Sequence, residues 1–138
     1  MREGNKRRIV IVAACALVDG EGRLLIARRP AGKPLAGLWE FPGGKVETDE
    51  APEAALIREL REELALEIAK DDLKPLTFAS HAYPDFHLLM PVYLCRKWQG
   101  SVTPLEGQEI LWVKPSELHA YDMPPADEPL KTTLSALL

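Results

Sequence analysis

Residues 43–66 read GGKVETDEAPEAALIRELREELAL, and most of this stretch has the apolar spacing of a helix. At about 100° per residue, apolar side chains at helical spacing form one stripe, which should face a core. That stripe consists of Leu56, Ile57, Leu60 and Leu64. Glu59, Glu62 and Glu63 fall on another face of the same predicted helix, which spans residues 51–64.

These three glutamates repel one another, because like charges three and four residues apart destabilise a helix by about 0.2–0.5 kcal/mol per pair. One interpretation is an ordinary solvated face, in which Arg58 pairs with Glu62 and Arg61 pairs with neighbouring acids. The other interpretation is a site for a hard divalent cation, Mg²⁺ or Mn²⁺, which prefers oxygen ligands. The charge pattern alone favours the solvated face.

The spacing of the whole stretch favours the metal site instead. The matching positions are Gly44, Glu50, Arg58-Glu59-Leu60, Glu62-Glu63 and Ala65-Leu66. They resemble the Nudix box, G-x5-E-x7-R-E-U-x-E-E-x-G-U with U aliphatic, at every position except Ala65, where the pattern has glycine. A left-handed residue is common at a helix end and costs a non-glycine residue about 1 kcal/mol. We therefore expect a slightly altered helix end and a retained metal site.

Composition restricts the class of protein further. The 138 residues, 46% of them hydrophobic, predict one domain over residues 1–138, and the net charge of -4 argues against a nucleic-acid polymer as partner. Cys15 and Cys95 lie in apolar runs and are predicted to be buried reduced thiols, which fits the cytoplasm. The apolar run after the basic residues NKRR is too short to span a membrane, and it continues through DGEG into a second strand-like run.

Strand-like runs dominate and helical signals are fewer, which predicts an α+β protein with helices packed on a mixed sheet. The predicted strands cover residues 8–18, 23–29, 76–83, 87–97 and 109–114, and further helical segments start at Ser116 and cover residues 128–138. For the first helix, Thr48 or Asp49 is the expected cap, because Ala51 before Pro52 is a poor one. The family resemblance implies a Nudix fold, in which a mixed β-sheet is packed between helices as an α/β/α sandwich.

The resemblance also implies which residues bind metal and catalyse. It makes Glu62 and Glu63 metal ligands together with the carbonyl of Gly43, and it gives Glu59 a place at the metal, where it positions water or a partner base. Arg58 would orient Glu59 through charge-assisted hydrogen bonds. Glu106 matches a position that serves relatives as an extra metal-binding carboxylate or general base, although it also fits an ordinary loop acid beside a turn glycine.

The loop ARRPAGKPLAGLWEFPGGKVE, residues 27–47, is similar to the MutT-like subgroup of 8-oxo-dGTP diphosphatases. The similarity implies that Arg29 contacts phosphate, although Arg28 and Arg29 also fit exposed cations at a strand end. It implies that Phe41 lines a base slot, and that the backbone from Glu40 through Phe41 and Pro42 to Gly43 offers polar contacts.

Asp127 stands where the best-known MutT pattern has asparagine. An ionised aspartate only accepts hydrogen bonds, which suits the two neighbouring donors of guanine and also the amino group of cytosine. Asp127 also fits a residue at a helix start, stabilised by the positive end of the helix, and both interpretations are compatible.

The expected activity is Mg²⁺-dependent hydrolysis of 8-oxo-dGTP to 8-oxo-dGMP and pyrophosphate, a nucleotide-pool sanitising reaction, with Mn²⁺ as a substitute metal. The alternatives are a CTP or modified dCTP pyrophosphohydrolase, a noncatalytic nucleotide-recognition module, and an acidic protein-interaction domain. The expected partner is a small nucleoside triphosphate, without membrane or nucleic-acid polymer, and the expected protein is a monomer or weak homodimer. His81, His87 and His119 lack metal-ligand spacing and are predicted to be structural.

Overall fold

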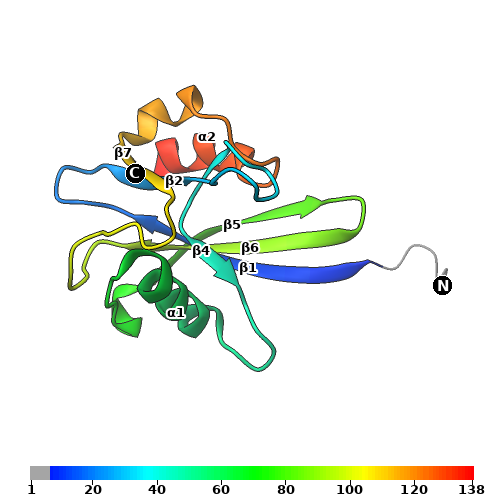
Figure 1. The fold of residues 1–138 in the computed structure, drawn as a ribbon, viewed down its shortest axis with the longest axis horizontal. Coiled ribbons are helices and arrows are strands. Elements are labelled where there is room, and N and C mark those ends of the chain that lie inside the picture. Colours follow the sequence, from blue (N-terminus) through cyan, green and yellow to red (C-terminus); the bar gives the residue numbers. More distant parts are fainter. Residues whose placement is uncertain (1–6) are drawn as a thin grey trace.

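The computed structural model describes residues 7–138 of the chain. The described part contains seven strands, two α-helices and two short 3-10 helices (Figure 1). In chain order they are β1 (Arg8–Leu17), β2 (Leu24–Arg28), β3 (Trp39–Glu40), β4 (Gly43–Lys45), α1 (Pro52–Leu64), η2 (Lys70–Asp72), β5 (Lys74–Ala82), β6 (Phe86–Cys95), β7 (Glu109–Val113), η3 (Pro115–Ala120) and α2 (Glu128–Leu137).

The strands form two sheets rather than one. The larger sheet has the order β4-β1-β6-β5, in which β1 runs parallel to β6 and antiparallel to β4. The smaller sheet is antiparallel, with the order β3-β2-β7. Helix α1 lies on one side of these sheets and α2 on the other (Figure 1), which confirms the predicted α+β class with a mixed sheet between helices.

The second half of β1, residues 13–17, is buried on both faces, which explains its continuous apolar sequence. Ala13, Cys15 and Leu17 pack in the hydrophobic cluster that contains the apolar stripe of α1. Ala14 and Ala16 pack in a second cluster with residues of β2, η3 and α2. Cys15 and Cys95 are buried free thiols, as predicted.

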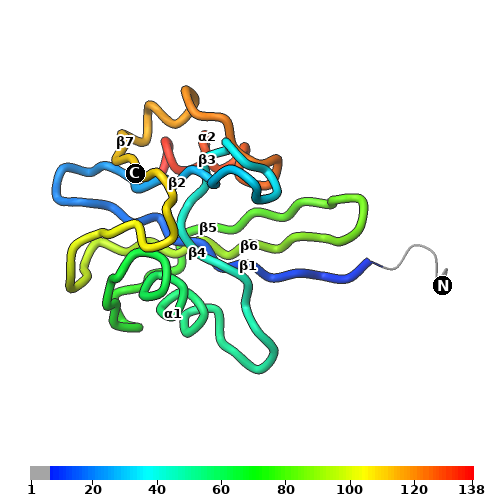
Figure 2. The backbone as a smooth tube through the Cα atoms, in the orientation of Figure 1, coloured from blue at the N-terminus to red at the C-terminus, as the bar shows by residue number. Residues whose placement is uncertain are grey.

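The DGEG segment, residues 19–22, forms the predicted hairpin turn. The carboxylate of Asp19 accepts hydrogen bonds from the backbone N–H groups of Glu21 and Arg23, at 3.0 and 2.8 Å. A bridge between Val18 and Leu24 closes the turn. Figure 2 shows the chain reversing here and passing from the larger sheet into the smaller one.

The predicted side-chain cap of α1 is wrong. The N-cap position is Ala51, and neither Thr48 nor Asp49 caps the helix, because no side chain bonds to its first turn. Asp49 instead occupies a tight turn with φ of 65°. The turn is held by the carboxylate of Glu50, which accepts the backbone N–H of Glu47 at 3.0 Å.

The helix end is regular despite the missing glycine, so the predicted alteration there is also wrong. Ala65 itself adopts the left-handed conformation, with φ of 60° and ψ of 33°. Its N–H donates to the carbonyl of Arg61 at 3.1 Å, and the N–H of Leu66 donates to that of Leu60 at 3.3 Å. The bond from Ala65 to Arg61 is the one that defines the αL capping motif, so the strain is confined to one residue.

We expect Ala65→Gly to stabilise the protein by up to about 1 kcal/mol, because glycine adopts the left-handed conformation without the Cβ clash. Urea unfolding measures the difference. Ala69→Gly is the matched control, because Ala69 has an extended backbone with φ of -82°. A glycine there adds only chain entropy and should not stabilise, and equal effects at both positions would contradict the assignment of strain to Ala65.

Some elements were not predicted. Strands β3 and β4 lie within the long segment after β2, which the sequence predicts to be a loop, and the sequence does not predict η2. The segment after Lys114 is a 3-10 helix over Pro115–Ala120. Between residues 7 and 138, no helix is long and apolar enough to cross a membrane.

Candidate active site

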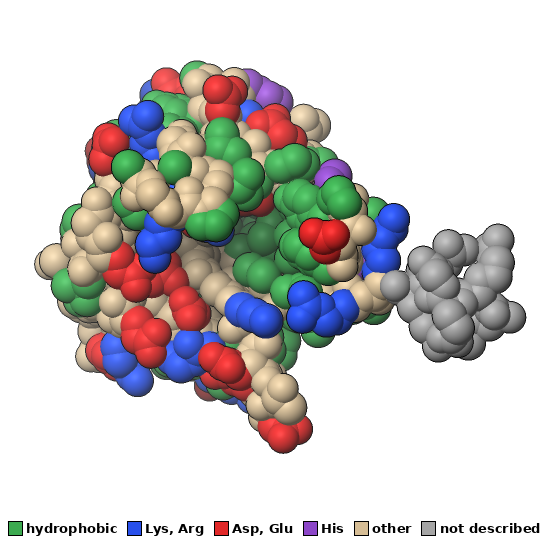
Figure 3. Space-filling model, turned by 45° about the vertical axis from the view of Figure 1, so that its right-hand side comes forward, with side chains coloured by type: hydrophobic (Ala, Val, Ile, Leu, Met, Phe, Trp, Pro, Cys, Tyr) green, Lys and Arg blue, Asp and Glu red, His purple; other side chains and the backbone are tan. Residues whose placement is uncertain are grey.

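A cavity of about 550 Å³ opens between the larger sheet and the chain around Phe41. This volume is within the range of small-molecule sites. Apolar side chains of β1 and β6 form its floor, and Asp127 and Arg29 contribute charged groups. Figure 3 shows the hollow lined with hydrophobic side chains and flanked by acidic and basic ones. The apolar lining includes Val10, Val12, Leu88, Met90, Tyr83 and Phe86. We call this space the base cavity.

Asp127 is a buried acid in the base cavity, with only 6% of its surface exposed. Burial is the main cause that raises its pKa to about 7, and the nearby carboxylate of Glu40 adds to the effect. Arg29 and the backbone N–H of Phe41 act in the opposite direction. Asp127 also stands immediately before α2 but makes no side-chain cap bond to it.

Glu40 pairs with Arg29, and the charges of both residues act on Asp127. The Nε of Arg29 donates to Oε2 of Glu40 at 3.1 Å, and Nη1 donates to the carbonyl of Pro34 at 3.3 Å. Burial raises the pKa of Glu40, while Arg29 opposes that rise. Asp127 near the C-terminus therefore lies close to the charged groups of Glu40 in β3 and of Arg29, the residue after β2.

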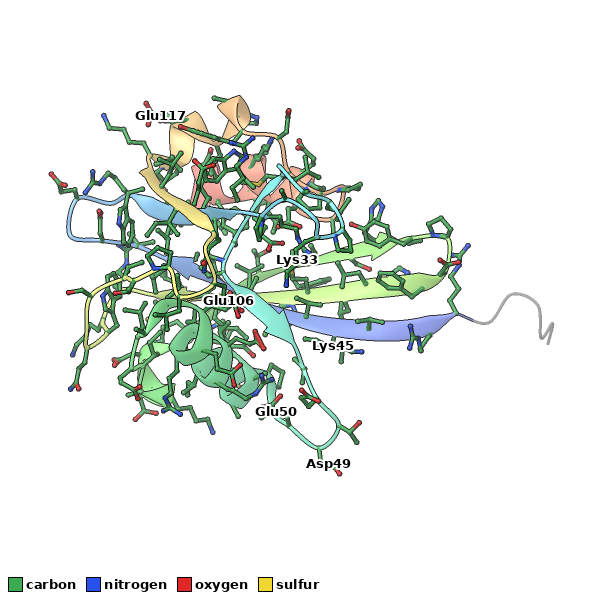
Figure 4. The ribbon with its side chains drawn as sticks, viewed as in Figure 1. Lys33, Lys45, Asp49, Glu50, Glu106 and Glu117 are labelled. Atoms are coloured by element: carbon green, nitrogen blue, oxygen red, sulfur yellow. The ribbon has the colours of Figure 1, made fainter. Side chains whose placement is uncertain are left out.

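A second, more polar pocket adjoins the base cavity and shares Arg29, Glu40 and Gly43 with it. We call it the acidic pocket, because Glu40, Glu63 and Glu106 line it together with basic side chains. Those basic side chains are Arg28, Arg29 and Lys33. In Figure 4, Lys33 comes from the segment after β2, and Glu106 lies beside β4.

Arg58 organises the acids of α1. It pairs with both carboxylate oxygens of Glu50, at 3.0 Å from Nε and 2.9 Å from Nη2. Its Nη1 donates to Glu59 at 2.8 Å, and its Nη2 donates to the carbonyl of Lys45 at 3.3 Å. The bidentate contact with Arg58 lowers the pKa of Glu50 to about 2. The predicted orienting contact between Arg58 and Glu59 is thus present.

Glu59 is also positioned by Gly44. A Cβ atom on Gly44 would lie 2.3 Å from the carboxyl carbon of Glu59 and 2.4 Å from its Oε2. The glycine that opens the box is therefore needed for space, since any side chain would displace the carboxylate. Gly43 has a similar constraint, because a Cβ there would lie 2.0 Å from the carbonyl oxygen of Ala13.

Carboxylates crowd around Glu63. Burial raises the pKa of Glu63 to about 10, and hydrogen bonding and repulsion from Glu59, together with the charges of Glu106 and Glu40, add to the shift. Between residues 7 and 138, no three His, Cys, Asp or Glu side chains already surround a common metal position. The donor set nevertheless fits a hard divalent cation, which would offset this repulsion with oxygen ligands.

Other predicted residues are less close to the two pockets. The side chain of Glu62 is 58% exposed and lies 3.8 Å from Nη1 of Arg58, so it resembles the solvated-face alternative. Arg61 pairs with Glu67, at 2.8 and 2.9 Å, rather than with an acid of the box. Pro42 lines neither pocket, because it is buried and its carbonyl accepts the N–H of Cys15 at 2.8 Å.

The sequence interpretation missed several residues that line these spaces. Lys33 and Gln108 reach the acidic pocket, and Tyr83 and Phe86 line the base cavity. Tyr83 stacks on Phe86 with ring centroids 5.1 Å apart, and its hydroxyl accepts the N–H of Ala126 at 3.3 Å. A basic residue in a glycine- and proline-rich loop was the available signal for Lys33, whereas the other three had no distinctive local pattern.

A family model described as a NUDIX domain matches residues 13–133. The chain belongs to the Nudix family. This confirms the family predicted from the box, and the chain is accordingly a Nudix hydrolase. Nudix hydrolases generally need a divalent metal, usually Mg²⁺.

Similar curated proteins carry two different substrate names. The chain is 37% identical to a CTP pyrophosphohydrolase of Escherichia coli, with 93% of each protein covered. It is 34% identical to an 8-oxo-dGTP diphosphatase of the same species, with 91% of this chain and 96% of the relative covered. Nudix pyrophosphohydrolases of both kinds are thus comparably similar to it.

Solved structures agree with this fold. The solution structure of the E. coli ORF135 protein superposes with a TM-score of 0.84 at 33% identity, covering 99% of this chain and 95% of the other. A MutT structure from a study of Aliivibrio salmonicida and Vibrio cholerae gives 0.80 at 29% identity, covering 95% and 100%.

Proposed function

We propose that this Nudix pyrophosphohydrolase acts on a nucleoside triphosphate, with 8-oxo-dGTP as the substrate and 8-oxo-dGMP and pyrophosphate as the products. The observation that carries the proposal is the adjacency of the two pockets through Arg29, Glu40 and Gly43. A base fits the apolar cavity closed by Asp127, and a phosphate chain leaving it would reach Glu63 and the basic side chains of the acidic pocket.

We assign the metal site to the carbonyl of Gly43 and to carboxylates of α1 and the 101–108 loop. Those carboxylates are Glu59, Glu62, Glu63 and Glu106. Bound Mg²⁺, or Mn²⁺ in its place, would neutralise phosphate charge and lower the pKa of a bound water. Glu62 must turn inward to take part, because its side chain is largely exposed in this structure.

The protein groups then have distinct roles. Arg58 holds Glu59 in one orientation, and Glu59 positions the attacking water or a partner base. Arg29 binds phosphate oxygens, for which a guanidinium is suited. Water attacks the β-phosphorus and the bond between that phosphorus and the bridging oxygen of the α-phosphate breaks. The nucleoside monophosphate leaves with the bridging oxygen, and the water oxygen ends in pyrophosphate. Glu106 serves as a further metal-binding carboxylate or as the base.

Base selection rests on Asp127. Its ionised carboxylate accepts from the two neighbouring donors of a guanine ring, and the N7–H of an 8-oxopurine would meet a backbone carbonyl. CTP is the second candidate, because a carboxyl group with a pKa of about 7 is also partly protonated and then matches cytosine. The similarity to a CTP pyrophosphohydrolase supports this candidate as well.

Pyrophosphate release from 8-oxo-dGTP, dGTP, CTP and modified dCTPs tests the proposal. We expect the highest kcat/KM for 8-oxo-dGTP. A higher value for CTP would replace the first candidate by the second. Binding of nucleotides without release of pyrophosphate would support a noncatalytic recognition module instead.

We expect Gly44→Ala to lower kcat by about tenfold, because the new methyl group displaces the carboxylate of Glu59 and misplaces a reacting group. Gly44 does not have a positive φ, so the substitution does not strain the backbone itself. Gly20→Ala is the matched control, because no atom lies within 4 Å of the added Cβ. Steady-state kinetics and thermal unfolding of both variants decide the point, and normal turnover of Gly44→Ala would contradict this position for Glu59.

One domain over residues 1–138, a cytoplasmic location and a monomer or weak homodimer remain predictions. Sedimentation of the purified protein measures the last of these directly.

A further inference from the structure

Two backbone hydrogen bonds join the loop before β7 to the end of α1. The N–H of Thr103 donates to the carbonyl of Leu64, and the N–H of Leu105 donates to the carbonyl of Glu63, both at 3.0 Å. The last carbonyls of a helix have no partner within the helix, so these bonds satisfy acceptors that would otherwise need water. The loop thereby follows α1 as far as Leu105, one residue before Glu106.

Gln108 completes this attachment with both ends of its side-chain amide. Its Nε2 donates to the carbonyl of Glu63 at 3.2 Å. Its Oε1 accepts the backbone N–H of Glu106 at 2.9 Å. Gly107 between them has φ of 73°, which folds the chain so that the side chain of Gln108 reaches back. One half-buried side chain therefore bridges the backbones of two acids that line the acidic pocket.

We propose that Gln108 is a positioning residue that holds Glu106 beside Glu63. The inference rests on the proposed function for the roles of these two acids, but the bridge itself is a structural feature. Glu106 has an exposed side chain, and its backbone N–H has no other hydrogen-bond partner in the part of the chain that the structure describes. Without Gln108, the segment after Leu105 would lose its attachment to α1.

The bridge requires an uncharged amide, because one group must donate and accept at the same time. An ionised glutamate at this position would still accept from Glu106 but could not donate to the carbonyl of Glu63. It would also add a fourth carboxylate to Glu40, Glu63 and Glu106 in the acidic pocket. Gln108→Glu therefore keeps the size of the side chain and removes half of the bridge.

Amide hydrogen exchange of the metal-free protein tests the bridge without any activity. In Gln108→Ala, the N–H of Glu106 should exchange about tenfold faster, while the N–H of Thr103 keeps its protection. Gln99→Ala is the matched control, because Gln99 lies in a different pocket, beside Trp98, and lines neither the acidic pocket nor the base cavity. An unchanged exchange rate for Glu106 in Gln108→Ala would overturn the bridge.

A double-mutant cycle with Glu106→Gln tests the positioning role. We expect Gln108→Ala and Gln108→Glu each to weaken Mn²⁺ binding to the nucleotide-free protein about tenfold, as loss of an orienting partner does. They should lower kcat with little change in KM. In the Glu106→Gln background, the further loss from Gln108→Ala should be under about twofold.

Full additivity of the two substitutions would overturn the inference, because it would mean that Gln108 acts independently of Glu106. Failure of the proposed function is distinguishable, since a wild-type protein that releases no pyrophosphate would refute the function. The exchange rates and Mn²⁺ affinities would still test the bridge.

Discussion

Replacing Glu63 with glutamine is expected to lower kcat/KM by roughly a thousandfold, which corresponds to about 4 kcal/mol of transition-state stabilisation. Glu63 lies where the carboxylates of α1 and the 101–108 loop converge, and it lines the pocket proposed for the phosphates. An amide of the same shape offers one neutral oxygen in place of a carboxylate. It should therefore bind the cation weakly and leave phosphate charge uncompensated.

The same substitution should not destabilise the metal-free fold, because it removes one member of a crowded set of acids. Added Mg²⁺ should raise the midpoint of thermal unfolding of the wild-type protein more than that of Glu63→Gln, since only bound ligand stabilises the native state. Glu67→Gln is the control, because Glu67 pairs with Arg61 in an exposed contact away from both pockets. Near-normal turnover of Glu63→Gln would exclude Glu63 as a metal ligand.

The Nudix box could be recognised from sequence because it depends only on residues that are close together in the chain. A helical period fixes which residues of 52–64 face the core, so the apolar stripe and the opposite acidic face followed from spacing alone. The link between Arg58 and Glu59 involves adjacent residues, and the structure contains it at 2.8 Å. The left-handed conformation of Ala65 was not predicted, because a residue other than glycine at this position indicated an altered helix end.

The division into two sheets was not predictable in the same way. It depends on pairings between distant strands, such as β1 with β6, whose partners Cys15 and Tyr93 are far apart in sequence. Alternation of apolar residues identifies a strand but not its neighbour. The short strands β3 and β4 exist because β2 and β1 provide partners for them. Their own sequence, rich in glycine and proline, indicated a loop.

The same distinction applies to the site. Glu62 met the box pattern but is largely exposed, because a helical pattern fixes the face of a residue and not the rotamer of its side chain. Gln108 had no pattern, since its role depends on a loop that returns to α1. The cap predicted from Thr48 or Asp49 failed because the turn before Pro52 is held by Glu50 instead. Sequence spacing thus identified the acidic residues of the candidate site. Tertiary contacts determine which other residues hold these acids in position.

We expect the substrate preference to change between about pH 6 and pH 8, because the protonation state of Asp127 alters what the base cavity recognises. The pKa of Asp127 is raised to about 7, mainly by burial. When ionised, its two oxygens accept from the neighbouring N1–H and amino group of guanine. When protonated, it donates through O–H and accepts through C=O, which matches the N3 acceptor and amino donor of cytosine.

The ratio of kcat/KM for CTP to that for 8-oxo-dGTP should therefore fall as pH rises through 7. A hydrogen bond to a charged group contributes about 1.5–3 kcal/mol, so the ratio should change roughly tenfold to a hundredfold. Measuring both substrates with one enzyme matters, because effects of pH on shared steps cancel in the ratio. Those steps include cation binding and water activation.

Asp127→Asn is the control, because an amide keeps one donor and one acceptor at every pH. Its ratio should not vary with pH, even though Glu40, Arg29, Glu128 and Tyr83 still surround the position. A ratio that varies equally in both proteins would assign the effect to one of those neighbours and contradict the role of Asp127.

Stability provides a second measurement of the same group. The pKa of Asp127 is raised from 3.8 to about 7 in the folded protein, so the folded state retains a proton that the unfolded state has already lost in that interval. The stability contributed by this proton is complete below pH 3.8 and is lost as pH rises through about 7. The asparagine in Asp127→Asn has no proton to lose in this range. The free energy of unfolding of this variant, relative to that of the wild type, should therefore increase from pH 4 to pH 8. Urea unfolding at several pH values measures that difference. A constant difference would mean that Asp127 is ionised throughout, and the proposed recognition of cytosine by its protonated form would then be wrong.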